Sequence, residues 1–408
     1  MLATLIPLFD DKLTVKAYSL FSQKANMLLN PALLGTGAND GAGTISGLEV
    51  IESMGIDTIS RDKEIFVSVN NISIFTDIDE QSKGAPHDRL VILTDKSIKP
   101  TQMYIDRLKE LKASGYKLAI RKLQVQDFEP YKEILLLVDY VFLDNKKIDI
   151  SKAKIYFSKV YPNVKLVAGN VETQEIYDSL VSEGGYTLYE GAFYRLPVTK
   201  GVNEVAPLKI NYIELLNIVN DVDFDLTKAA DIIGRDTALV LNLLQIVNKM
   251  SVNSEITSIR HAAAMLGQKE LKKWINTAVT NQLCADKPNE VTRISLLRAK
   301  FAENLAPCFD RAGLASEYFL MGLFSVIDII LDMPMKEALK KVKVSKQIEN
   351  ALVDGKGEFF DVLNFVLQYE SANWGEVDRL MLLSKMDSKA IYDAYCSSLT
   401  WYRDLFRS

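Results

Sequence analysis

The 408-residue sequence has few of the residues from which metal centres and disulfides are built. It contains two histidines, His87 and His261, and three cysteines, Cys284, Cys308 and Cys396, which lie far apart. Without a closely spaced pair, the cysteines favour buried free thiols over a disulfide framework or a zinc knuckle. Two histidines cannot form an imidazole-rich metal cage, so we expect no bound metal and no other cofactor.

Long hydrophobic runs are also missing. The longest, residues 318–331, contains Asp328 and is shorter than the roughly 20 residues of a membrane-spanning helix, so we expect a buried helix there. The first seven residues contain no basic side chain and are soon followed by Asp10 and Asp11, which does not fit a signal peptide. The sequence therefore predicts a cytoplasmic protein with no membrane partner.

The chain has no excess of positive charge. Its net charge is -5, which offers no basic surface for a phosphate backbone, so we do not expect a nucleic-acid partner. With 48% hydrophobic and 25% charged residues, the composition is that of a folded globular protein. A length of 408 residues favours two domains over one.

The first half of the chain alternates between strand and helix signals. Short runs rich in branched residues predict strands at 64–74, 90–94, 117–120, 140–143 and 165–168. Between two of them, Tyr104, Leu108 and Leu111 share one face of an expected helix, and Gly115 follows where it would end. Repeated strand and helix units imply a parallel sheet or a closed barrel, with its chemistry at the carboxyl ends of the strands.

The character of the sequence changes after Pro197, and from Ile210 onward nearly all of it predicts helix. Apolar stripes at helical spacing include residues 239–247 and 259–266, and Gly267 follows the second. We therefore predict two domains, 1–200 and 201–408, joined by a linker between residues 197 and 207. The glycine-rich run 35–43 lacks a phosphate-loop pattern and predicts a loop.

Four segments near the expected strand ends resemble the signature segments of EAL domains, which are barrel phosphodiesterases that hydrolyse cyclic di-GMP. The segments are Tyr18–Phe21, Ile92–Asp95, Ala119–Leu123 and Val167–Thr173. The resemblance implies a TIM-like α/β barrel of the EAL type. In that family these positions carry metal-binding carboxylates and a catalytic lysine.

Most of the expected functional groups have been replaced in this chain. The positions that align with the family's site are Ser19, Asn70, Ile92, Arg121, Lys122, Phe142, Gly169, Glu172 and Glu190. Serine and glycine stand for two glutamates, Ile92 or Leu93 for a third, and phenylalanine for the lysine. Asn70 and Glu172 retain the expected type, with Asn71 as an alternative to Asn70, and Glu190 replaces a glutamine.

The paired aspartates of the family align with Arg121 and Lys122, after the string Gly115–Ile120. Replacing two carboxylates by two cations changes the local charge by about four units, which should repel a divalent metal. The pair is a candidate anion-binding site. The alternative is a pair of cations that are solvated or bound in surface salt bridges.

The second half resembles the HDOD family, a helical fold related to HD phosphohydrolases but without their metal site. The resemblance rests on the segments 234–244, 247–248, 256–262 and 265–274. Two later segments, 297–303 and 319–328, are similar to the C-terminal part of fused EAL and HDOD proteins. His261 lies beside an apolar stripe and is expected to be structural, and His87 is expected in a surface loop.

Three functions follow from these resemblances. The first is a catalytically inactive bacterial signalling or scaffold protein that acts through protein–protein interaction, in regulation of the motility or biofilm type. The second is a metal-independent cyclic di-GMP sensor with the HDOD domain as output, and the third is a working phosphodiesterase with rearranged ligands. Trp374 and Trp401 are candidate interface anchors or core residues. Partner identity and pathway stay open, as does homo-oligomerisation.

Overall fold

The computed structural model describes residues 1–24, 44–195, 207–221, 223–234, 236–250, 256 and 258–405. The chain divides into two compact units. The first comprises residues 1–196 together with 364–408, and the second comprises 197–363. The glycine-rich run 35–43 and most of the expected linker lie outside the described residues.

The first unit contains a closed eight-stranded barrel. Its strands are β1 (Leu2–Phe9), β2 (Val15–Gln23), β3 (Glu64–Ser68), β4 (Leu90–Thr94), β5 (Lys117–Ile120), β6 (Tyr140–Asp144), β7 (Lys165–Gly169) and β8 (Leu188–Glu190). Strand β1 runs antiparallel to β2 and β8, and the other neighbouring pairs are parallel. The predicted α/β barrel is confirmed, with one antiparallel strand in place of an all-parallel arrangement.

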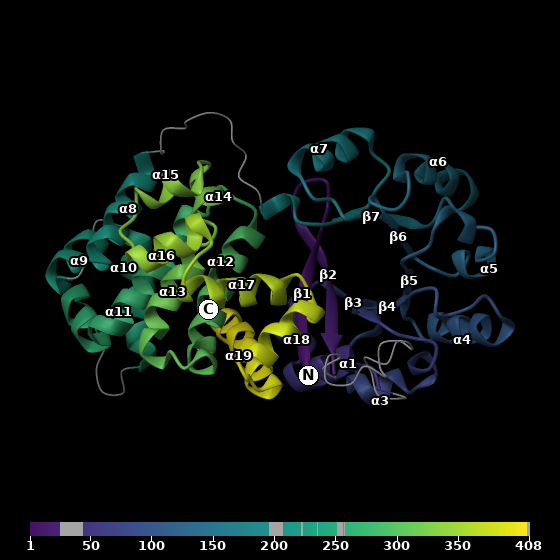
Figure 1. Cartoon of the computed structure of the whole chain (residues 1–408), viewed down its shortest axis with the longest axis horizontal. Coiled ribbons are helices and arrows are strands. Elements are labelled where there is room, and N and C mark those ends of the chain that lie inside the picture. The colour runs from purple at the N-terminus through teal and green to yellow at the C-terminus, as the bar shows by residue number, and fades with distance from the viewer. Residues whose placement is uncertain are drawn as a thin grey trace. The chain divides into compact units, whose positions relative to one another are not determined.

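Helices follow most of the parallel strands and cover the outside of the barrel (Figure 1). They are α1 (Ser46–Met54), α2 (Ile56–Ser60), α3 (Ile78–Ser82), α4 (Gln102–Ala113), α5 (Lys132–Leu135), α6 (Ile150–Val160) and α7 (Gln174–Glu183). Helix α4 buries Leu108 and Leu111 as predicted, and Gly115 follows it with a φ of 94°.

Side chains on successive residues of each strand alternate between the barrel interior and the surrounding helices. One buried cluster collects interior residues of all eight strands, namely Leu8, Ala17, Phe66, Val91, Leu93, Ala119, Tyr140, Phe142, Val167 and Leu188. Residues next to them in sequence, such as Val67, Ile92 and Val141, are fully buried but do not belong to this cluster. The interior is therefore a packed core, and functional groups can lie only at its ends.

The last helices of the chain pack on the barrel. They are α17 (Glu358–Glu370), within which the boundary between the units falls, α18 (Trp374–Leu383) and α19 (Ser388–Leu405). The hydroxyl of the fully buried Tyr369 accepts a hydrogen bond from the backbone N–H of Ala3 at 3.2 Å. The side-chain amide of Gln23 donates to the buried carboxylate of Asp378 at 2.8 Å.

This packing corrects the predicted range 201–408 for the second domain, because residues 364–408 belong to the barrel unit. A helical pattern shows that a segment buries one face but does not show which core receives it. Of the two candidate anchors, Trp374 packs its ring edge-on against Tyr369 at 5.3 Å, which gives it a structural contact inside the barrel unit. Trp401 is partly buried in α19.

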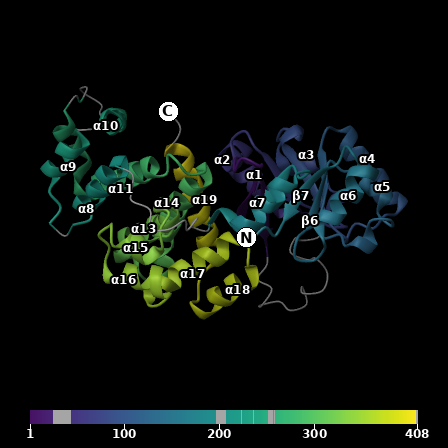
Figure 2. The same ribbon diagram turned by 90° about the horizontal axis from the view of Figure 1, so that it is seen from above.

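The second unit is helical throughout its described residues. Its helices are α8 (Pro207–Val219), α9 (Leu226–Ile233), α10 (Thr237–Met250), α11 (Ile259–Leu283), α12 (Asn289–Leu305), α13 (Ala315–Phe324), α14 (Ile327–Leu331), α15 (Met335–Leu339) and α16 (Lys346–Glu349). Figure 2 shows α8 to α11 grouped together, with α13 to α16 beside them. Helix α11 is kinked at Gly267, where the φ is 72° and the expected helix was predicted to end.

The apolar run 318–331 is buried as predicted, but it forms two helices and not one. Helix α13 ends at Phe324 and α14 begins at Ile327, because Val326 between them has a non-helical ψ of 19°. The hydroxyl of Ser325 donates to the carbonyl of Gly322 at 2.7 Å, which satisfies one of the last carbonyls of α13. Over the described part of the chain, no helix has the length and apolar character needed to cross a membrane.

His87 makes more contacts than a surface loop residue would. Its ring stacks on Tyr116 at 4.1 Å, Nδ1 lies 2.6 Å from the carbonyl of Ser114, and Nε2 lies 2.5 Å from Asp79. The pKa of His87 is raised, first by the Ser114 carbonyl and then by Asp79, although partial burial opposes the shift. Protonated His87 can donate to both acceptors at once.

We therefore expect His87 to stabilise the barrel in acid. A raised pKa in the folded state gives stability that is complete below the ordinary value of 6.5 and is lost as the pH rises through the folded pKa. Urea unfolding of the native chain and of His87→Gln should show a difference in free energy at about pH 6 that shrinks by about pH 8. An equal difference at both values would contradict this assignment.

Candidate functional site

The alternation of the strands brings five of the predicted site positions to the carboxyl end of the barrel. Each lies two residues beyond a member of the interior cluster and therefore shares its inward direction. The five are Ser19 in β2, Arg121 directly after β5, Phe142 in β6, Gly169 in β7 and Glu190 in β8. Phe142 is itself part of the cluster.

Three of these side chains form a hydrogen-bonded group across the barrel, called the Glu190 group below: Ser19, Arg121 and Glu190. The hydroxyl of Ser19 donates to Oε2 of Glu190 at 3.2 Å, and Nη2 of Arg121 donates to Oε1 at 3.1 Å. Ser19 and Glu190 are buried, and the Arg121 side chain is 19% exposed. Both oxygens of Glu190 are thus occupied by donors, and its charge is balanced by the guanidinium.

Two aromatic rings hold the guanidinium of Arg121. Its Cζ lies 5.2 Å from the centre of the Phe21 ring and 5.1 Å from that of Phe142. Phe142 is fixed in turn by an edge contact with Phe66 at 5.4 Å. Cation–π attraction adds to the ion pair and limits the positions that the guanidinium can take. Nη1 of Arg121 is buried and has no hydrogen-bond partner among the described residues.

This group is poorly suited to hold a divalent cation. Mg²⁺ and Mn²⁺ prefer several oxygen ligands, most of them carboxylates. Glu190 is already paired with a cation, and the neighbouring positions supply a hydroxyl, a phenyl ring and a glycine. Among the residues with assigned positions, no cluster of three or more His, Cys, Asp or Glu side chains could hold a metal ion.

Arg121 and Lys122 diverge, so the structure does not support them as one anion-binding pair. Lys122 has a φ of 64°, and its exposed ammonium binds Oδ2 of Asp95 at 2.8 Å, away from the Glu190 group. Burial alone would raise the pKa of Asp95, but the hydrogen bonds from Lys122 and Ser97 outweigh it and the pKa is lowered. Lys122 therefore forms a surface ion pair, which was the stated alternative.

Three further predicted positions lie outside the Glu190 group. Asn70 follows β3, and its side-chain oxygen accepts hydrogen bonds from the backbone N–H groups of Ile72 and Ser73, so it closes a turn. Glu172 is 54% exposed and pairs with Lys146 at 2.6 Å. Neither contributes a group that is free to converge on the centre of the barrel.

The third position was predicted as Ile92, with Leu93 as the alternative. Ile92 is fully buried but is not part of the interior cluster, whereas Leu93 belongs to it. Of the two alternatives, Leu93 is therefore the one that lies in the barrel interior. Either residue replaces a charged ligand by an alkyl group, and the consequence for metal binding is unchanged.

Sequence reasoning missed two residues near the site. Phe21 lies two residues after Ser19, and Asp144 lies two residues after Phe142, so the period of two in a strand could have identified both. Asp144 accepts a hydrogen bond from the side chain of Asn170 at 2.7 Å. Burial would raise its pKa, but Asn170 and the Lys146 backbone N–H act against burial and lower it.

Comparison with known proteins supports the two-part architecture. The HDOD domain family matches residues 206–361, within the second unit. The uncharacterized protein YuxH of Bacillus subtilis is 27% identical over 98% of this chain and 97% of its own length. The cyclic di-GMP phosphodiesterase CdgJ of Vibrio cholerae is 24% identical over 79% of this chain and 75% of its own length.

Among solved structures, the PaMucR phosphodiesterase in complex with c-di-GMP covers 47% of this chain and 94% of its own, with 14% identity and a TM-score of 0.38. The first unit is a closed barrel whose first strand is antiparallel to both of its neighbours. The HDOD match describes the second. The chain therefore combines a closed eight-stranded α/β barrel with a helical region that matches the HDOD domain family.

Proposed function

We propose that this chain is a catalytically inactive regulatory protein of cyclic di-GMP signalling that acts through protein–protein interaction. The observation that carries the proposal is the group formed by Arg121, Glu190 and Ser19 at the carboxyl end of the barrel. The Arg121 guanidinium lies there against the rings of Phe21 and Phe142. Each oxygen of the Glu190 carboxylate already accepts a hydrogen bond, one from Arg121 and one from Ser19.

Electrostatics favours this proposal over catalysis. A metal-assisted hydrolysis needs the cation to hold the phosphate and to lower the pKa of the attacking water. A divalent cation beside the Arg121 guanidinium would meet a repulsion of roughly 1 to 4 kcal/mol for each unit of charge at a few ångströms. The hydrophobic Phe142 also stands where the family has its catalytic lysine, so the site lacks a second group that the reaction requires.

We expect no hydrolysis of cyclic di-GMP. Purified chain should produce no linear dinucleotide above a blank in the presence of Mg²⁺ or Mn²⁺, as followed by chromatography. The Vibrio cholerae relative that is named a cyclic di-GMP phosphodiesterase provides a positive control. Turnover that disappears in Glu190→Gln would contradict the proposal, because it would place the activity in this barrel.

A metal-independent cyclic di-GMP sensor is the second candidate. It is favoured by Nη1 of Arg121, a buried donor that no acceptor among the described residues satisfies. A ligand phosphate could accept from it without a metal. Calorimetric titration with cyclic di-GMP, with and without Mg²⁺, separates the candidates: Mg²⁺-independent heat that is lost in Arg121→Met supports the sensor, and no saturable heat supports the scaffold.

Under the scaffold proposal, the effect of this protein in the cell should depend on surface contacts and not on a reactive group. Lys122→Ala and Glu172→Ala remove exposed ion pairs and should leave that effect intact. A chain cut after about residue 200 should lose it, but such a cut also removes the segment 364–408, which packs on the barrel. Exposed apolar residues of the helical unit, such as Leu241 and Met265, are better positions for substitution because they are 55% and 46% exposed.

A further inference from the structure

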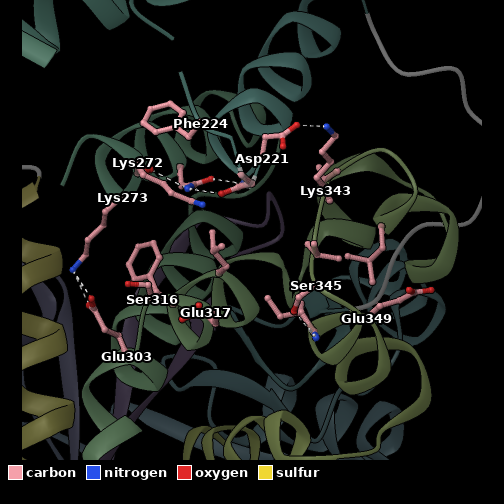
Figure 3. A pocket seen from close by; sticks show the side chains of 18 of the residues that line it. Asp221, Phe224, Lys272, Lys273, Glu303, Ser316, Glu317, Lys343, Ser345 and Glu349 are labelled. Atoms are coloured by element: carbon pink, nitrogen blue, oxygen red, sulfur yellow. Dashed lines mark hydrogen bonds and ion pairs between the residues drawn. The ribbon is translucent and has the colours of Figure 1, made fainter. Parts of the chain in front are cut away.

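The helical unit contains a pocket of about 830 Å³, within the usual size range of small-molecule sites. It is formed by the segment after α8, by α11, α12, α13 and by the stretch from α15 to α16. Figure 3 shows Phe224, Lys272 and Asp221 along one side, and Glu317, Ser345 and Glu349 along the other. All of its lining residues belong to the second unit.

The lining is richer in ammonium groups than in carboxylates. Six lysines line the pocket, at 269, 272, 273, 336, 340 and 343, against four acids, at 221, 303, 317 and 349. Two of the acids are already used in the lining, because Asp221 binds Lys343 at 2.5 Å and Glu303 binds Lys273 at 2.7 Å. Glu349 is held by Lys346 at 2.9 Å. The pocket therefore presents a positive surface, although the whole chain is acidic.

Lys272 is one of the six lysines of this surface. It is partly buried on α11, and within the described ranges of the chain its ammonium has no hydrogen bond or ion pair. Burial lowers the pKa of Lys272, and the more distant charges of Glu317 and Asp221 only partly restore it. An ammonium that is partly desolvated and lacks a direct partner gains from an anion that enters the pocket.

Apolar side chains form the floor of the same pocket. Phe319, Leu339, Val342 and Ile348 are buried, and Phe224 is partly buried beside them. A simple inorganic anion would leave this apolar surface in contact with water. A ligand that joins a ring to a phosphate would cover the floor and also reach the lysines.

We propose that this pocket binds a small phosphorylated organic anion with a planar ring, the chemical class of the nucleotides. The phosphate would be held by Lys272 and by Lys336, which also lacks an ion pair among the described residues. The ring would lie against Phe224 and the buried floor. The inference is independent of the barrel, because no residue of the Glu190 group lines this pocket.

Fluorescence titration of the full chain with trinitrophenyl-ATP tests the proposal, since the emission of this probe rises when its ring enters an apolar site. We expect saturable enhancement that GMP or ATP reverses and that weakens as salt is added. Lys272→Gln should weaken binding about tenfold, because a charge-assisted hydrogen bond is lost, and Lys336→Gln should weaken it less.

Matched controls separate this site from others. Lys228→Gln, on the exposed face of α9 and outside the pocket, should bind the probe as the native chain does. Thermal unfolding of each variant verifies the fold. Absence of saturable enhancement in the native chain would overturn the proposal, and so would equal affinity in folded Lys272→Gln, Lys336→Gln and Lys228→Gln.

Discussion

A chain that ends at Leu363 should fail to form a stable barrel, although it retains all eight strands. The missing segment carries Tyr369, which is fully buried and binds the backbone of β1, and Asp378, which is 1% exposed and binds Gln23 of β2. Its loss would expose the apolar surface that α17 to α19 cover and leave buried donors without acceptors. Circular dichroism during heating should show no cooperative transition for the barrel.

Point substitutions give the same test without truncation. Tyr369→Ala should lower the free energy of unfolding by about 3–5 kcal/mol, as is usual for a large buried aromatic residue. Tyr369→Phe should cost about 1–3 kcal/mol, because the N–H of Ala3 loses its acceptor. Leu383→Ala is the control, since Leu383 lies in α18 of the same segment but is 69% exposed. If the first two variants unfold like the control in denaturant, the C-terminal helices do not support the barrel.

Arg121→Ala should destabilise the chain far more than Lys122→Ala, although the two residues are adjacent. Removal of the guanidinium leaves the carboxylate of Glu190 buried with only Ser19 as a donor. Loss of one partner of a buried pair typically costs 3–5 kcal/mol, and the partial exposure of Arg121 reduces the expected cost to about 2–4 kcal/mol. The exposed pair of Lys122 with Asp95 should contribute no more than about 1 kcal/mol.

Guanidinium unfolding of both variants measures this contrast, and Glu190→Gln completes the comparison. In the double variant Arg121→Ala with Glu190→Gln, the cost should be clearly smaller than the sum of the single costs, because no unpaired charge stays buried. Strict additivity, or equal costs at positions 121 and 122, would show that the Arg121–Glu190 pair does not organise the site.

Strands β3 to β7 and the helical unit were predictable because their patterns are local. Strands β4 and β5 match the predicted ranges, since each is a short buried run ended by polar residues. The predicted strand 64–74 is too long because Asn70 closes a turn after Ser68, where β3 ends. Strands β1, β2 and β8 were not predicted as strands. Strand β1 is an almost continuous buried run without polar alternation, β2 mixes buried and exposed residues, and β8 has only three residues.

The candidate site was predictable in position but not in its contacts. The order of the segments identified Ser19, Arg121 and Glu190 from elements that are distant in sequence. These three residues converge only because the barrel closes. Arg121 and Lys122 diverge because side chains of adjacent residues point in opposite directions and because Lys122 has a positive φ. The association of residues 364–408 with the barrel is likewise a tertiary property that no helical pattern encodes.

We infer that the Arg121 guanidinium occupies the place beside Glu190 where a metal ion would bind. Titration of Mn²⁺ into the native chain, followed by the electron paramagnetic resonance of the ion, tests this directly. Bound Mn²⁺ loses the sharp six-line spectrum of the hydrated ion. Because Arg121 already neutralises Glu190, we predict that the spectrum of the native chain matches that of free Mn²⁺ at each step. Stoichiometric loss of the free-ion signal that Glu190→Gln abolishes would contradict the account.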